Sequence, residues 1–245
     1  MEFKLPVIKI AMESLAICWF YRSVLLKVLA LPVFLVIVFD FTRHNIINID
    51  GYLSIIILNA IYFVFLSFIF INCHRLFLLG LNHVPTYGME LNSRYFKFLA
   101  WIVLIAIIFF IVWYIVLLII LNLFGFVIDY SADPEGTFII QNINWIEIIA
   151  TLLTLYFTSR MSFVFPSIAI DGNPSIKWSW KLTNNNGLRV FVLIALLPLL
   201  FTEIIEFFYR DQPSTIEIII FHIFSYLALS IEVAFLSITF KHFID

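Results

Sequence analysis

The stretch FLAWIVLIAIIFFIVWYIVLLIILNL (residues 98–123) runs for 26 consecutive residues without a single charged side chain. A helix that crosses a bilayer needs about 20 mostly apolar residues. A helix that is apolar on every side lies either in the core of a large protein or in a membrane. Because a soluble chain of 245 residues could not cover so much apolar surface, the stretch predicts a transmembrane helix.

The rest of the chain has the same character. Hydrophobic residues make up 63% of it and charged residues 12%, and the mean hydropathy is +1.08. Soluble domains are about 45–50% apolar and about 25% charged. We therefore predict an all-α, polytopic integral membrane protein. Its six transmembrane helices are expected at about residues 23–39, 52–73, 98–123, 145–165, 190–209 and 216–240.

Basic residues are distributed unevenly between the predicted loops. Twelve of the fourteen Lys and Arg residues fall on one side of this six-helix topology, and only Arg43 and Arg210 fall on the other. Positive charge is retained in the cytoplasm, so both termini are expected there. The net charge of −2 excludes a nucleic-acid role that depends on bulk charge. The predicted partners are the lipid bilayer, with anionic lipids at the cytoplasmic face, and other membrane proteins or a second copy of the chain.

Two shorter helices are expected to lie in the cytoplasmic interface, at about residues 8–22 and 174–183. In the second, Asn173 can cap the helix, with Pro174 at its first position. The sequence NNNG (184–187) then provides the stop.

A lysine stripe runs along this second interfacial helix, and apolar residues flank it on both sides. Such a helix suits the headgroup layer, where tryptophans anchor it and lysines meet lipid phosphates. The candidate headgroup contacts are Lys177, Trp178, Trp180 and Lys181. A helix that only positions its neighbours explains the same pattern equally well.

Ionisable residues inside the predicted spans are candidates for function, because each is costly in lipid unless paired or hydrated. Glu203, Glu206 and His222 lie near the outer ends of the last two spans. They could form an outward-facing proton or cation site. We favour a structural interpretation, in which Glu206 pairs with Arg210 and Glu203 hydrogen-bonds His222.

A second group is predicted in the inner half of the membrane. Glu232, Arg160 and Lys27 fall at similar depths on three different spans. We expect Glu232 to form a structural ion pair with Arg160 or Lys27.

Motifs for catalysis or cofactor binding are not found. The sequence has no Gly-rich phosphate loop, HExxH motif or CxxC motif. Its two cysteines, Cys18 and Cys73, are too few for a disulfide scaffold. We therefore predict no catalytic residues, no cofactor and no metal.

The segment RMSFVFPSIAIDGNPSIKWSWKLTNNN (160–186) resembles a pattern in uncharacterised bacterial inner-membrane proteins similar to YciC. It also resembles the membrane domain of some glycerophosphodiester phosphodiesterases. NCHRLFLLG (72–80) and RYFKFLAWIVLI (94–105) are similar to their inter-hairpin segment. The resemblance implies a multi-pass protein of the bacterial cytoplasmic (inner) membrane. It suggests structural roles for Arg160, Pro166, Trp180 and Thr183. No phosphodiesterase domain is present in this sequence.

Three functions follow as hypotheses. The leading one is a non-enzymatic protein of unknown specific role that organises the membrane or envelope through lipid or protein partners. The alternative is a small transporter or channel component that uses Glu203, Glu206 and His222. An integral-membrane enzyme is third.

Overall fold

The computed structural model describes residues 4–45, 52–85, 90–123, 137–207 and 215–245. Within these ranges every regular element is a helix. The helices are α1 (Val7–Phe20), α2 (Arg22–Asn45), α3 (Tyr52–Leu79), α4 (Ser93–Leu123), α5 (Thr137–Met161), α6 (Val164–Ala169), α7 (Ile176–Leu182), α8 (Gly187–Phe191), α9 (Leu197–Phe207) and α10 (Thr215–Ile244), with a 3-10 turn η1 (Leu81–His83) and a π-helical turn η2 (Val192–Leu196).

Several of these helices are long and apolar enough to cross a membrane, as the sequence predicts. Among the described residues five stretches qualify on their own, namely Ala60–Leu79, Ser93–Ile120, Trp145–Ala169, Gly187–Ile204 and Ile223–Ile244. A sixth span is obtained when α1 and α2 are counted together. The all-helical fold is therefore confirmed, and five or six of its segments are long and apolar enough to span a membrane.

The pair α1 and α2 is bent by 74°. The bend lies at Tyr21, at the end of the segment expected to be an interfacial helix. Helix α1 packs against α10 and leaves a row of large apolar side chains exposed, Ile8, Met12, Trp19 and Phe20. A separate helix with one packed face and one exposed apolar face has the form of a helix in the membrane interface.

Helices α2, α3 and α10 form the main core. Val36, Ile69, Cys73 and Ala234 lie at its centre and are fully buried. A second cluster joins the N-terminal segment and α1 to α8, η2 and the end of α10, through Leu5, Ile10, Leu193 and Phe240. The first and last helices therefore share one packed centre.

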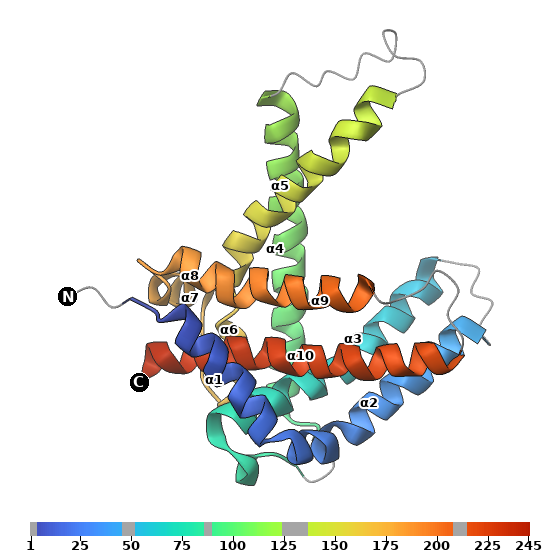
Figure 1. Cartoon of the computed structure of the whole chain (residues 1–245), viewed down its shortest axis with the longest axis vertical. Helices are drawn as coiled ribbons and strands as arrows, with labels where there is room; N and C mark the ends of the chain where they lie inside the picture. The colour runs from blue at the N-terminus through green and yellow to red at the C-terminus, as the bar shows by residue number, and fades with distance from the viewer. Residues whose placement is uncertain (1–3, 46–51, 86–89, 124–136, 208–214) are drawn as a thin grey trace.

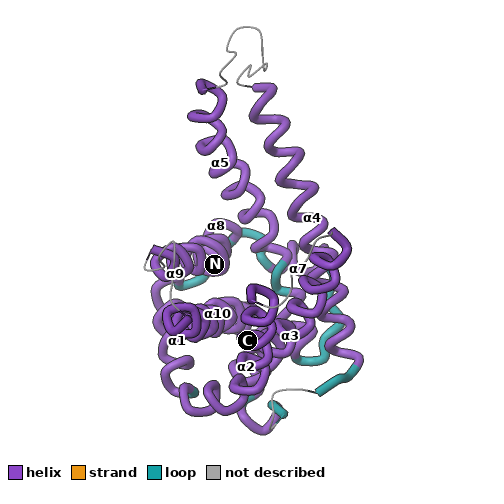
Figure 2. The backbone as a smooth tube through the Cα atoms, turned by 90° about the vertical axis from the view of Figure 1, so that its right-hand side faces the viewer, coloured by secondary structure: helices purple, strands orange, loops and turns teal. Residues whose placement is uncertain are grey.

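The hairpin of α4 and α5 stands out from this core. In Figures 1 and 2 the two helices rise crosswise to α9 and α10 and reach well beyond them. Along its most apolar stretch, α4 buries no residue in the protein. Phe110 and Tyr114, for example, are 67% and 57% exposed. Within the hairpin, Ile120, Ile146 and Ala150 form a small cluster, and Trp113 donates a hydrogen bond to Thr151. Outside that seam, the described surface of α4 needs lipid tails or another protein to cover it.

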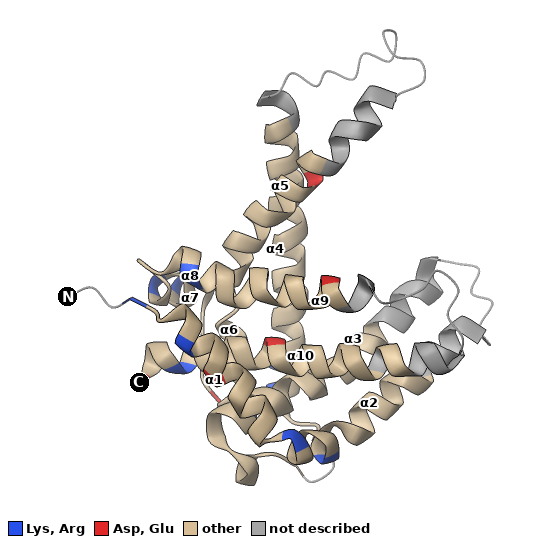
Figure 3. Cartoon of the chain, viewed as in Figure 1, with Lys and Arg blue, Asp and Glu red and all other residues tan. Residues whose placement is uncertain are grey.

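Basic residues gather at the end of the molecule where α1, α7, α8 and the end of α10 meet, and others lie at the junction of α1 and α2 (Figure 3). The N-terminal segment and the end of α10 both reach this region. The backbone N–H of Leu5 donates a hydrogen bond to Asn186 Oδ1 at 3.0 Å. On α10, His242 Nε2 lies 2.7 Å from Oε2 of Glu13 on α1. We call this region the basic end.

The charge asymmetry predicts the orientation of the chain. Alkaline phosphatase fused after Pro134, between α4 and α5, should be active in a bacterial host, because that loop is expected outside the cytoplasm. Fused after Asn185, at the basic end, it should be inactive. The opposite pattern of activities would reverse the topology.

Candidate functional site

Helix α7 begins with a side-chain cap. The hydroxyl of Ser175 accepts a hydrogen bond from the backbone N–H of Trp178 at 3.1 Å. Asn173, the expected cap, lies two residues too early. The reason is that Pro174 favours an extended conformation in the residue before it, and the chain stays extended through Ser175. The helix itself lies where the sequence places it.

Arg160 holds α7 against the end of α5. Its side chain donates to Thr183 Oγ1 at 3.0 Å and to the carbonyl of Trp180 at 3.1 Å. The guanidinium carbon lies 3.8 Å from the centre of the Trp180 ring. In return, the hydroxyl of Ser179 donates to the carbonyl of Arg160 at 2.6 Å. Both the charge and the planar face of the guanidinium are used.

These contacts bring together three of the four residues of the segment 160–186 for which the sequence predicts a structural role. Arg160, Trp180 and Thr183 meet in one cluster, although up to 23 residues separate them. Pro166 is buried in α6 and is not part of that cluster. The ring of Trp180 also stacks on Phe157 at 6.0 Å. Trp180, a candidate headgroup contact, is half-buried and packs from α7 against Phe157 and Arg160 of α5.

The turn after α7 connects to the N-terminal segment. Asn185 has a φ of 65°, in the left-handed region that asparagine tolerates. The next residue, Asn186, accepts from Leu5, and Arg189 donates to the carbonyl of Leu5 at 3.1 Å. At Gly187 a Cβ atom would lie 2.7 Å from the hydroxyl of Tyr156. The glycine therefore allows the turn to approach α5 closely.

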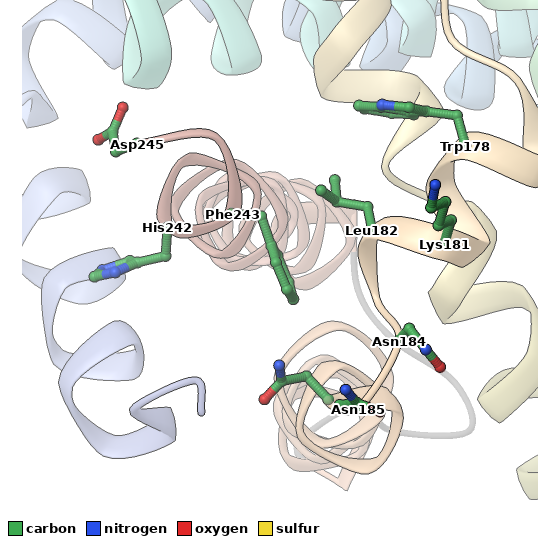
Figure 4. A pocket seen from close by; sticks show the side chains of 9 residues that line it. Trp178, Lys181, Leu182, Asn184, Asn185, His242, Phe243 and Asp245 are labelled. Atoms are coloured by element: carbon green, nitrogen blue, oxygen red, sulfur yellow. The ribbon is translucent and has the colours of Figure 1, made fainter. Parts of the chain in front are cut away.

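A hollow of about 770 Å³ opens between this turn and the end of α10. Figure 4 shows Trp178, Lys181 and Leu182 of α7 on one side of it, with Asn184 and Asn185 on the turn below. His242, Phe243 and Asp245 come from the end of α10 on the other side. We call this cavity the headgroup hollow, after the sequence-predicted headgroup contacts Trp178 and Lys181 that line it.

The headgroup hollow combines several kinds of polar group. Lys181 supplies a cation, the asparagine amides supply donors and acceptors, and Asp245 supplies an anion. Trp178 adds an aromatic wall whose other edge packs on Phe240. Of the four predicted headgroup contacts, Trp178 and Lys181 line the hollow, and Lys177 is exposed on the same helix.

A second polar cluster fixes the start of the α6–α7 connection. Asp171 receives two hydrogen bonds from Arg94, at 2.7 and 2.9 Å, and an ion pair from Arg75 at 3.3 Å. Arg75 also donates to the carbonyl of Ala169 at 2.7 Å. One carboxylate thus ties α3, α4 and α6 together. Next to it, Gly172 lies so close to Ser167 that a Cβ atom would collide with it.

The two arginines set the ionisation of Asp171. Partial burial raises the pKa of its carboxyl, but the hydrogen bonds and charges of Arg94 and Arg75 outweigh this effect. The pKa is therefore lowered from its ordinary value of 3.8.

The predicted outward-facing site is described only in part. Glu203 is exposed on α9. The side chains of Glu206 and His222 lie outside the described residues. The site therefore stays a prediction, in both its transport and its structural interpretation.

The expected ion pair of Glu232 with Arg160 or Lys27 is corrected. Arg160 binds α7, Lys27 is exposed on α2, and Glu232 Oε1 accepts a hydrogen bond from Thr202 on α9 at 3.1 Å. No ion pair joins these three groups in the part of the chain that the structure describes. The physical reason is that similar depth along the helices does not determine which way each side chain points around its helix axis.

Sequence reasoning missed the residues that the fold brings to the hollow from afar. His242 and Asp245 are separated from α7 by the last two long helices, and no spacing rule connects them. The asparagines were noted only as a helix stop. Among the described residues, no cluster of three or more His, Cys, Asp or Glu side chains could hold a metal ion.

Comparison of the chain with protein-family models, curated proteins and solved structures yields no match.

The Arg160 cluster leads to a stability prediction. Arg160→Met should lower the free energy of unfolding by about 2–3 kcal/mol, because buried hydrogen bonds from a charged donor are lost. Arg160→Lys should recover only part of this, since an ammonium cannot provide the planar contact. Thermal melting of the purified protein in detergent measures both effects. Lys177→Met, which removes an exposed cation from the same region, is the control. Equal melting of Arg160→Met and Lys177→Met would contradict the role of Arg160.

Asp171 leads to a pH prediction. A carboxyl whose pKa is lowered in the folded state adds stability above its unfolded pKa, near 3.8. That contribution is lost as the pH falls below this value, through the folded pKa. Asp171→Asn should therefore melt at a lower temperature near neutral pH and show a weaker loss of stability in acid. Glu147→Gln, at an exposed carboxylate on α5, should keep the wild-type pH dependence. Identical acid profiles for wild type and Asp171→Asn would refute the link.

Proposed function

We propose that the protein is a non-enzymatic, multi-pass protein of the bacterial cytoplasmic membrane that binds phospholipid headgroups at its basic end and organises the membrane through them. The headgroup hollow is the observation that carries this proposal. It lies next to α7, whose exposed lysines and half-buried tryptophan suit the headgroup layer.

The polar groups of the hollow match the parts of a headgroup. The ammonium of Lys181 can bind a phosphate, and the amides of Asn184 and Asn185 can donate to its remaining oxygens. The carboxylate of Asp245 disfavours a purely anionic group, and it can accept the ammonium of an ethanolamine headgroup. The shared chemistry is a phosphate ester, and a zwitterionic headgroup satisfies both charges.

Charge distribution supports the same placement. The twelve basic residues that share a side in the six-span topology include those of the basic end, so the hollow would face the cytoplasmic leaflet. Basic residues near that surface each contribute about 1 kcal/mol of attraction to anionic lipid. The resemblance of the segment 160–186 to YciC-like inner-membrane proteins supports a location in the bacterial cytoplasmic membrane.

Lipid binding is tested by native mass spectrometry of the purified protein, titrated separately with phosphatidylethanolamine and phosphatidylglycerol. Lys181→Gln should weaken binding about fivefold, the equivalent of about 1 kcal/mol. Lys97→Gln removes an exposed lysine from α4, away from the hollow, and should bind as the wild type does.

The two lipids separate the sources of recognition. If ethanolamine lipid binds more tightly and Asp245→Asn removes its advantage, both charges of the hollow are used. If phosphatidylglycerol binds more tightly, the phosphate and the basic surface dominate. Equal binding by wild type, Lys181→Gln and Lys97→Gln would reject the hollow as a lipid site.

A further inference from the structure

A second cavity, lined mostly by half-buried residues, lies between the helices and apart from the headgroup hollow. It has a volume of about 230 Å³ and lies between α3, α4, α10, η2 and the connection from α5 to α6. Its polar lining comes from Glu232, His74 and Ser162. Its aromatic lining comes from Phe70, Phe98 and Phe165.

Hydrogen bonds fix the tautomer of His74. The hydroxyl of Ser237 donates to the carbonyl of Val233 at 2.7 Å, so its single proton is already used. The 2.8 Å contact between Ser237 Oγ and His74 Nδ1 then requires the histidine to donate. In the neutral ring, which is 1% exposed, Nε2 therefore carries a lone pair.

The other two polar groups are acceptors as well. The hydroxyl of Ser162 donates to the carbonyl of Ser159 at 2.7 Å, which leaves only its lone pairs for a ligand. Glu232 Oε1 accepts from Thr202, and its carboxylate has no ion pair within the described residues. With Glu232 ionised, every polar side chain of the cavity offers a lone pair, and none of them offers a free proton. The complementary ligand brings N–H donors and a positive charge.

The aromatic lining favours the same ligand. The ring centres of Phe98 and Phe165 lie 5.0 Å apart, and the ring centres of Phe70 and Phe98 lie 6.4 Å apart. Aromatic faces attract cations, most strongly where water is excluded. An acidic side chain within a spanning helix also marks a functional site by default, because burying it unpaired is costly. The neighbouring turn η2 is π-helical, a geometry that is frequent at functional sites.

We propose that this cavity binds a small organic ammonium ion. Its N–H groups would meet Glu232, His74 and Ser162, and its apolar part would lie against the three phenylalanines. The proposal does not depend on lipid binding at the basic end.

Isothermal titration calorimetry of the full chain in detergent micelles tests this inference, with empty micelles as the blank. Phenethylamine is the cationic probe, and phenethyl alcohol is the neutral probe of the same shape. The wild type should bind the amine at least about tenfold more tightly, since hydrogen bonds to a charged group are the stronger ones. Glu232→Gln should remove this advantage. Glu147→Gln, a matched change at an exposed carboxylate on α5, should keep it.

A second variant covers the case in which Glu232→Gln does not fold. Ile194 of η2 lines the cavity, and Ile194→Phe fills space without changing any charge. This variant should lose the binding of both probes. The proposal is overturned if the wild type binds the two probes equally. It is also overturned if folded Glu232→Gln keeps the preference for the amine, or if Ile194→Phe binds the amine as the wild type does.

Discussion

The guanidinium of Arg160 is the interaction on which the basic end depends. It joins the last turn of α5 to the last turn of α7 through Thr183 and the carbonyl and ring of Trp180. With α7 held there, the following turn carries Asn186 to the N-terminal segment and leaves a hollow beside the end of α10. A single buried cation, through two hydrogen bonds and one ring contact, thus fixes the polar connection between α5 and α8 in a defined conformation. This use agrees with the rule that charges in or near a membrane are kept where they have partners.

Composition and segment length predict the fold class well, because the bilayer imposes a minimum length of apolar helix. The stretch 98–123 is recognisable without any structure, and it lies in α4. The short helix expected at about 174–183 is also predictable, since Pro174 marks its start and the NNNG sequence (184–187) marks its end. Its cap was misplaced by two residues, because several residues in DGNPS can cap a helix.

The candidate sites were much harder to predict. Depth along a helix can be counted from the sequence, but rotation about the helix axis and the tilt between helices cannot. For this reason Glu232, Arg160 and Lys27 were expected to meet, whereas the structure directs them to three different surroundings. The acceptor-only character of the inner cavity depends on where the protons of Ser162 and Ser237 point. That property arises from local hydrogen bonds and leaves no pattern in the sequence.

The attachment of the N-terminal segment has a consequence for how the protein is made. Leu5 hydrogen-bonds a residue 181 positions later, and α1 packs on α10. Chains are synthesised from the N-terminus, so α1 is made well before α10. The contact between α1 and α10 can form only after the helices between them have been made. Before that, the exposed apolar face of α1 can hold the helix at the membrane surface. The packing of α1 on α10 therefore belongs to a late stage of folding, after the synthesis of α10.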